Sequence, residues 1–242
     1  MIAYCAVVLL LTFTLRGSVG FGGSIGMPLF ALVLPVKVLA PAWSLIGILS
    51  SAAILGKDRK LVDRKAFLGL LPGCAIGVAV GLFLFTTFDA RLLARLLGGF
   101  VILYSAWCFW RLYHPAGAAK FVPPLVLRTL GSFLSGAVGT LFGAMASVFF
   151  SLYLDGCGAT KSVYRATISA MLFTLSIVRT AAYVAAGEFT IDALMFCGAA
   201  IPFMLLGLLV GDKIHTGLTE RAFQYIVAIT LLVCGLPLLL KP

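Results

Sequence analysis

Long apolar stretches, separated by short charged connections, recur along the whole chain. Most approach the twenty or so residues that a helix needs to cross the hydrocarbon core of a bilayer, and few charges interrupt them. The pattern predicts eight apolar segments, at residues 2–35, 38–55, 66–88, 92–112, 126–154, 163–186, 190–211 and 222–240.

The composition agrees with this pattern. Of the 242 residues, 62% are hydrophobic and 11% are charged, and the mean hydropathy is +1.15. A soluble domain would carry about a quarter charged residues. We therefore expect an all-α polytopic integral membrane protein embedded in a lipid bilayer. The opening residues show no basic region and no cleavage pattern, so we expect them to form the first membrane segment rather than a signal peptide.

The net charge of +10 does not indicate a nucleic-acid partner. Lys and Arg concentrate in the short connections, as they do in the cytoplasmic loops of membrane proteins. The six cysteines are scattered without a C-x-x-C pair, and the chain has only two histidines. We therefore expect no metal site, no cofactor and no disulfide framework.

The first apolar segment is interrupted by RGSVGFGGSIGMP at residues 16–28, which contains five glycines. Backbone that leaves the helix at membrane depth is tolerated only where protein buries it or where it lines a watery cavity. Glycine lets a ligand approach free amides, serine adds hydroxyls, and arginine adds a planar donor fork that matches oxyanions. We expect Pro28 to start the second half-helix. The predicted substrate-binding residues here are Arg16, Ser18, Gly20, Gly22, Gly23 and Ser24.

The alternative interpretation of this interruption is close helix packing. Gly22 and Gly26 form a small-xxx-small pattern that is typical of helix interfaces in membranes. Packing alone, however, requires neither an arginine nor so dense a group of glycines.

The two halves of the chain carry related motifs in the same order. LRGSVG at 15–20 is similar to LSGAVG at 134–139, and one proline followed by two glycines recurs at a constant offset in 72–81 and 202–211. Such internal similarity predicts a repeat. The expected organisation is a first transmembrane repeat at 1–114, a connecting loop at 115–125 and a second transmembrane repeat at 126–242.

The distribution of Lys and Arg predicts how the repeats are oriented. The loop GKDRKLVDRK anchors the cytoplasmic side, because basic residues favour that side. If all eight segments cross once, nine loop charges lie inside and seven outside, whereas two re-entrant segments give 12 inside and 4 outside. The arms 2–15 and 27–35 would span about 21 and 14 Å, too short for each to cross alone. The count favours inverted repeats that each open with a glycine-broken re-entrant hairpin; one discontinuous crossing is the alternative.

Segment 163–186 supplies further candidates. Arg165, Arg179 and Tyr183 are spaced so that they share one helical face. An arginine inside a membrane span indicates a functional site by default, although both arginines are near enough to the segment's ends to snorkel. The predicted substrate-binding residues of the second half are Ser135, Gly139, Gly143, Arg165, Arg179 and Tyr183.

A glycine occurs at every fourth position in segment 66–88, from Gly69 to Gly81. This spacing predicts close helix packing, either within the chain or across a homodimer.

All eight acidic residues lie at or near segment ends. A proton- or sodium-coupled carrier usually keeps a carboxylate in mid-membrane, and this sequence places none clearly there. It also shows no Ser/His/Asp set, paired carboxylates or metal cluster, so we expect no enzymatic activity.

Several of these motifs resemble the TauE/SafE family of membrane transporters, also called the sulfite exporter or toluenesulfonate permease family. They are the glycine run from Gly17 to Pro28, the basic loop ending in Leu-Val-Asp at 61–63, and the arginine-bearing stretch 164–187. The resemblance covers essentially the whole chain. One departure is Met-Ala-Ser at 145–147, where relatives often carry Gly-Gly-Pro. The resemblance implies movement of small sulfur oxyanions or organosulfonates, often outward, across the bacterial inner membrane.

The residues and the resemblance together predict a transporter of a small anionic substrate, either sulfite, a sulfonate or a related sulfur oxyanion. Export would be driven by the membrane potential. The alternatives are a proton-coupled transporter of another small organic anion and a non-transporting receptor or scaffold.

Overall fold

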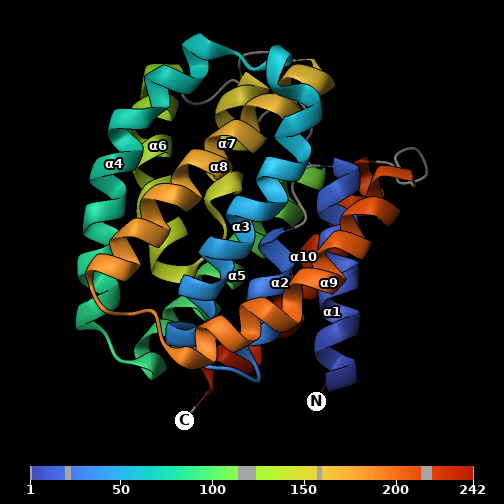
Figure 1. Ribbon diagram of the computed structural model, residues 1–242. Coiled ribbons are helices and arrows are strands. Elements are labelled where there is room, and N and C mark those ends of the chain that lie inside the picture. The colour runs from blue at the N-terminus through green and yellow to red at the C-terminus, as the bar shows by residue number, and fades with distance from the viewer. Residues whose placement is uncertain (1, 20–22, 114–123, 157–159, 214–219, 242) are drawn as a thin grey trace.

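The structure is a computed structural model that describes residues 2–19, 23–113, 124–156, 160–213 and 220–241 (Figure 1). These residues form ten α-helices and a short 3-10 helix, and no strand, which confirms the predicted all-α fold. The elements are α1 (Ile2–Val19), α2 (Gly23–Ala31), α3 (Val36–Asp58), η1 (Arg59–Leu61), α4 (Arg64–Thr87), α5 (Ala90–Tyr113), α6 (Pro124–Phe142), α7 (Ala146–Gly156), α8 (Lys161–Ala185), α9 (Ile191–Lys213) and α10 (Glu220–Leu239).

Within the described residues, six helices are long and apolar enough to cross a membrane: α3, α4, α5, α6, α8 and α9. Their outer faces expose large apolar side chains such as Leu103, which is 72% exposed, and Ile191, which is 75% exposed. Such faces are stable against lipid, where they need no polar cover. The chain is therefore a polytopic integral membrane protein.

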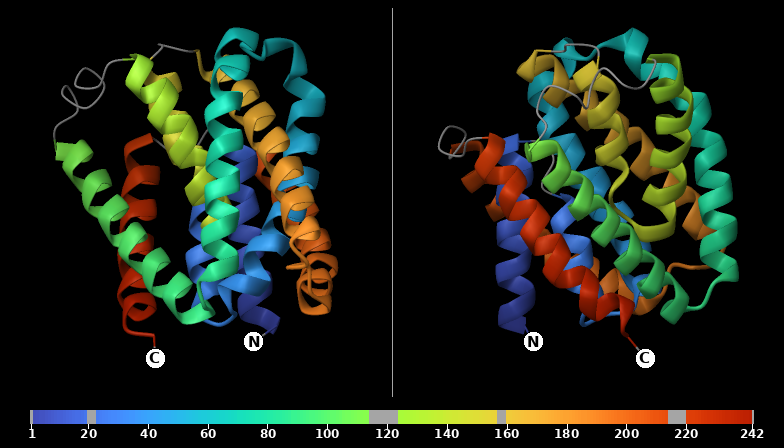
Figure 2. Two further views of the ribbon diagram at one scale, coloured as in Figure 1. Left: turned by 90° about the vertical axis from the view of Figure 1, so that its left-hand side faces the viewer. Right: turned by 180° about the vertical axis from the view of Figure 1, so that it is seen from behind.

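Both glycine-broken segments form a pair of helices. In each pair, α1 with α2 and α6 with α7, the two helices run in opposite directions, and their outer ends lie at the same end of the molecule (Figures 1 and 2). We call these pairs the first and the second hairpin. With nine and eleven residues, α2 and α7 span only about 14 and 16 Å. The membrane topology that these hairpins imply stays a prediction.

The structure corrects two details of the first hairpin. Its second helix begins at Gly23, whereas the sequence suggested a start at Pro28, which lies inside α2. At this position the proline ring cannot donate the intrahelical hydrogen bond that the Ser24 carbonyl would otherwise accept. The first helix has 18 residues, about 27 Å, and so is longer than the arm expected from the sequence.

Helices of the first half of the chain pack mainly against helices of the second half. Helix α4 lies along α6, and α9 lies along α1, while α5 packs on α10 and α3 on α8. Glycines allow the first two contacts: a Cβ atom added at Gly77 would lie 3.0 Å from the Gly136 Cα, and one added at Gly211 would lie 3.0 Å from the Gly17 Cα. Two related four-segment units would produce this symmetric pattern, but the repeat itself stays a prediction.

The glycine repeat of α4 therefore serves helix packing within the chain. Gly73, Gly77 and Gly81 all face α6 at distances that leave no room for a side chain. The homodimer predicted through such faces gains no support, because α6 already covers this one.

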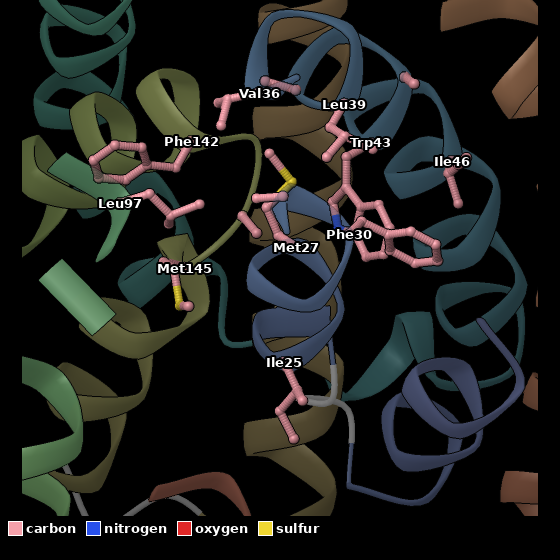
Figure 3. Close-up of a cluster of buried hydrophobic side chains, with 14 of the residues drawn as sticks. Ile25, Met27, Phe30, Val36, Leu39, Trp43, Ile46, Leu97, Phe142 and Met145 are labelled. Atoms are coloured by element: carbon pink, nitrogen blue, oxygen red, sulfur yellow. The ribbon is translucent and has the colours of Figure 1, made fainter. Parts of the chain in front are cut away.

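Helix α2 lies in the interior of the molecule. Met27, Phe30 and Ala31 are fully buried, and Figure 3 shows Met27 and Phe30 beside Trp43 and Leu39 of α3. The Phe30 and Trp43 rings are 5.9 Å apart between centroids. This enclosure surrounds the second helix of the first hairpin with protein.

The basic loop and the start of α8 lie at the same end of the molecule, opposite the two chain ends marked in Figure 1. Helix α8 contacts η1, and the backbone N–H of Asp63 donates a hydrogen bond of 3.0 Å to Thr167 Oγ1. Side-chain oxygen Oδ1 of Asp63 in turn caps α4 by accepting from the N–H groups of Lys65 and Ala66. The predicted inverted topology requires these two regions to share one side of the membrane.

Candidate functional site

The break between α6 and α7 is held in an unusual backbone conformation. Gly143 has φ of 75° and Met145 has φ of 72°, both in the left-handed region. Few residues other than glycine adopt this region without cost. At Gly143 glycine is also required sterically, because an added Cβ would lie 2.7 Å from the Ala40 Cα of α3.

Helix α8 fixes this break through two polar side chains on one face. Arg179 is 3% exposed, and its Nη2 donates a hydrogen bond of 2.7 Å to the Gly143 carbonyl. One turn later, the Tyr183 hydroxyl donates to the carbonyl of Thr140 in the last turn of α6. The Gly143 carbonyl, directly after the end of α6, thus accepts from the positively charged guanidinium of Arg179.

The first hairpin contributes a second buried arginine. Arg16 lies in the last turn of α1, where a helix end favours a cation. Its side chain is 6% exposed, and its Nη2 donates a hydrogen bond of 2.7 Å to Ser51 Oγ of α3.

Both arginines line one small pocket in the interior. Ser24 and Ser147, each the second residue of its helix, also line it, and their hydroxyl oxygens are 3.2 Å apart. The tips of the two hairpins therefore meet at this pocket. The lining residues are Arg16, Ser24, Trp43, Gly47, Gly143, Ala144, Met145, Ala146, Ser147, Leu172, Ser176 and Arg179.

The pocket is strongly positive. Its described lining includes two guanidinium groups and no acidic residue. In the described part of the chain, Nε of Arg16 and Nε of Arg179 are buried without a hydrogen-bond partner. Buried charged donors without partners are costly and are usually satisfied by a counter-charge. The arrangement can bind an anion.

The structure brings together four of the residues predicted from the sequence: Arg16, Ser24, Gly143 and Arg179 line the pocket. Ser18 and Gly23 lie in α1 and at the start of α2, but their side-chain surroundings are outside the description, and Gly20 and Gly22 lie outside the described residues altogether.

Four other predicted residues are not among those that line the pocket. Ser135 donates a hydrogen bond of 3.1 Å to the Ala146 carbonyl, and Gly139 packs against Ala146. Tyr183 supports α6 as described above. Arg165 shares a face with Arg179, but fourteen residues of helix separate the two by about 21 Å along the axis. Helical periodicity identified the shared face and gave no information about depth.

Sequence reasoning missed most of the pocket's walls. Ser176 lies three residues before Arg179, so helical spacing could have identified it. Ser147 was noted only as a departure from relatives. Trp43, Gly47 and Leu172 carry no local signal, because such residues are ordinary in apolar helices.

Short helices that meet at a charged, buried pocket in a bundle of membrane helices are an arrangement that membrane transporters use at their substrate sites. The particular family follows from the sequence. The profile of the family described as sulfite exporter TauE/SafE matches residues 4–238, so the chain belongs to this family. The resemblance found in the motifs is thereby confirmed.

A curated relative agrees with this assignment. The chain is 26% identical over 188 residues to a Comamonas testosteroni protein named "Probable inner membrane transporter protein TsaS", which covers 76% of this chain and 75% of that protein. No solved structure gives a significant match. Family, relative and membrane-length helices together identify an integral protein of a bacterial inner membrane.

Proposed function

We propose that this chain exports a small sulfur oxyanion, such as sulfite or a sulfonate, through the pocket between Arg16 and Arg179. The observation that carries the proposal is the pair itself: two buried arginines, Arg16 from the first hairpin and Arg179 from α8, line one pocket, and each has an Nε without a partner among the described residues. The family description and the relative's name support transport, and the family description supports a sulfur oxyanion.

The broken helices support the same function. Transporters place half-helix N-termini, with their free N–H groups and positive dipole ends, at anionic substrates. Helices α2 and α7 both begin at the pocket. In this proposal the hairpins are re-entrant from opposite sides of the membrane, so that each tip reaches the substrate from its own side.

The driving force in this proposal is the membrane potential. With the cytoplasm negative, each elementary charge that leaves gains about 2.3 kcal/mol per 100 mV. A monoanion at roughly 120 mV would gain nearly 3 kcal/mol, about a hundredfold in concentration ratio. The described pocket lining has no acid that could carry a coupling proton.

The test is flux of labelled sulfite into proteoliposomes whose voltage is set by valinomycin and potassium. We expect voltage alone to drive flux, and we expect Arg16→Gln and Arg179→Gln each to reduce it by about ten- to a hundredfold, because each removes a charge-assisted donor. Arg91→Gln is the matched control, because Arg91 is exposed at the start of α5.

Three results would contradict the proposal in different ways. Normal flux in both arginine variants would remove the pocket from the pathway. Flux that responds only to a pH step would indicate proton coupling, with Asp155 near the end of α7 as the first acid to replace. The absence of flux for every anion tested would favour a receptor or scaffold.

A further inference from the structure

The charges around the pocket exceed what a monoanion can neutralise. Arg16 and Arg179 are both more than nine-tenths buried, and the ten other described lining residues are uncharged. Arginine keeps its proton even when buried, so both charges persist. An anion with one negative charge would leave a net positive charge in the membrane interior, where charge is most costly. An anion with two negative charges would neutralise the pair.

The two hairpin tips add to this positive potential. Ser24 and Ser147 lie in the first turns of α2 and α7, where helices carry N–H groups without intrahelical partners and a partial positive charge. Both residues line the pocket with the arginines. The helix termini thus favour the same higher charge state of the ligand.

Residues that carry hydrogen-bond donors line the pocket from both hairpins and from α8. Each arginine uses Nη2 for a protein partner, Ser51 or the Gly143 carbonyl, and keeps a buried Nε unpaired among the described residues. Ser24, Ser147 and Ser176, each of which carries a hydroxyl, line the same pocket. A carboxylate presents its acceptor sites in one plane. A ligand with three or more oxygens presents acceptors in more directions and so suits donors that come from both hairpins and from α8.

From these observations, and resting on the proposed function, we infer that the pocket selects doubly charged oxyanions with three or more oxygens over monoanionic sulfonates and over carboxylates. Charge and oxygen count therefore determine the preferred substrate class, and an organic substituent on sulfur, which replaces one charged oxygen, weakens binding.

Sulfate and methanesulfonate provide a matched pair of probes. Both present oxygens around a tetrahedral sulfur, but methyl replaces one oxygen in methanesulfonate and removes one negative charge. We would titrate each probe, and acetate, into the purified full chain in lipid nanodiscs by isothermal titration calorimetry at one pH and ionic strength. We expect sulfate to bind at least about tenfold more tightly than methanesulfonate, and acetate to bind weakest.

Variants show whether the two arginines cause the preference. Arg16→Gln and Arg179→Gln should each bring the ratio of the two dissociation constants close to one, whereas Arg16→Lys, which keeps the charge, should retain the preference. Arg91→Gln should leave the ratio unchanged. Size-exclusion chromatography and circular dichroism would confirm that each variant remains folded, and Arg16→Lys keeps the test decisive if a glutamine variant does not fold.

The outcomes separate this inference from the proposed function. Methanesulfonate that binds as tightly as sulfate, with both dependent on the arginines, would overturn the charge preference and leave anion transport standing. A sulfate preference that survives in both glutamine variants would overturn the role of the arginine pair. If neither anion binds or crosses the membrane, the inference and the proposed function both fail.

Discussion

Ser24 and Ser147 are 123 positions apart in the chain, yet their hydroxyl oxygens lie 3.2 Å apart in the interior. Each occupies the second position of a short helix, and together they join the tips of the two hairpins beside Arg16 and Arg179. The pocket is therefore assembled from both halves of the chain, and neither half contains it.

The serine pair should contribute directly to anion binding. We expect Ser24→Ala and Ser147→Ala each to weaken sulfate binding about three- to tenfold, since a hydrogen bond is worth about 0.5–1.5 kcal/mol. The double variant should lose less than the product of the two effects, because the residues are in contact. Calorimetric titration would measure this, with Thr129→Ala, an exposed change on α6, as the control. Unchanged affinity in both single variants would exclude the pair from the site.

Gly143→Ala should destabilise the protein more than Gly187→Ala. Both glycines have φ near 75°, at 75° and 73°, so both substitutions incur about 1–2 kcal/mol of backbone cost. Only the Cβ at position 143 meets a neighbour, at 2.7 Å from Ala40, whereas nothing lies within 4 Å at position 187. Thermal unfolding in detergent at one scan rate should therefore show the larger fall in midpoint for Gly143→Ala. Equal falls would mean that the close approach to α3 is unimportant.

The fold was largely predictable because a helix that crosses a bilayer must be about twenty residues long and mostly apolar. Apolar length predicted the helices that are long enough to cross a membrane: the predicted segment 38–55, for example, lies within α3. The two breaks were predictable from the dense glycine run at 16–28 and its weaker counterpart in the second half, whereas the regularly spaced glycines of α4 remain helical. The start of α2 was not, because residues 23–27 include two glycines, a serine and a β-branched residue with weak helix preference, and α2 gains its helical form from packing against α1, α3, α5 and α10.

The site was predictable only where its residues are charged and lie within an otherwise apolar segment. Arg16 and Arg179 were identifiable because a charge in an apolar span needs a reason. Trp43 and Leu172 were not, because they fit a membrane helix whether or not a pocket is present. Tertiary packing alone brings them to the arginines.

The glycine contact between α9 and α1 should also be measurable. Gly211→Ala should destabilise the protein, since its Cβ would meet the Thr14 carbonyl and lie 3.0 Å from the Gly17 Cα. Gly198→Ala, in the same helix but with nothing within 4 Å, should change stability by no more than about 1 kcal/mol, the difference in helix propensity. Thermal unfolding of the two variants side by side makes the comparison. A Gly211→Ala midpoint at or above that of Gly198→Ala would contradict the packing.

The inverted topology predicts a labelling pattern. In a background without native cysteines, Lys60→Cys in η1 and Ser162→Cys in α8 should react with a membrane-impermeant maleimide from the cytoplasmic side, because these elements contact each other. Ala186→Cys, in the exposed turn after α8, should react from the outside. Inside-out and right-side-out vesicles would compare the three. Labelling of positions 60 and 162 from opposite sides would support eight simple crossings instead.

The packing of α1 from the first half of the chain on α9 from the second half has a consequence for how the protein is made. Helix α1 leaves the ribosome well before α9, the helix that fills its glycine face, because α9 begins 189 residues later, at Ile191. At about 5–20 residues per second, this interval is roughly 10–40 s. During that time the first hairpin must wait in the bilayer with its close-packing surface against lipid or against the insertion machinery. The close contact between α1 and α9 can therefore form only after most of the residues between them have been synthesised.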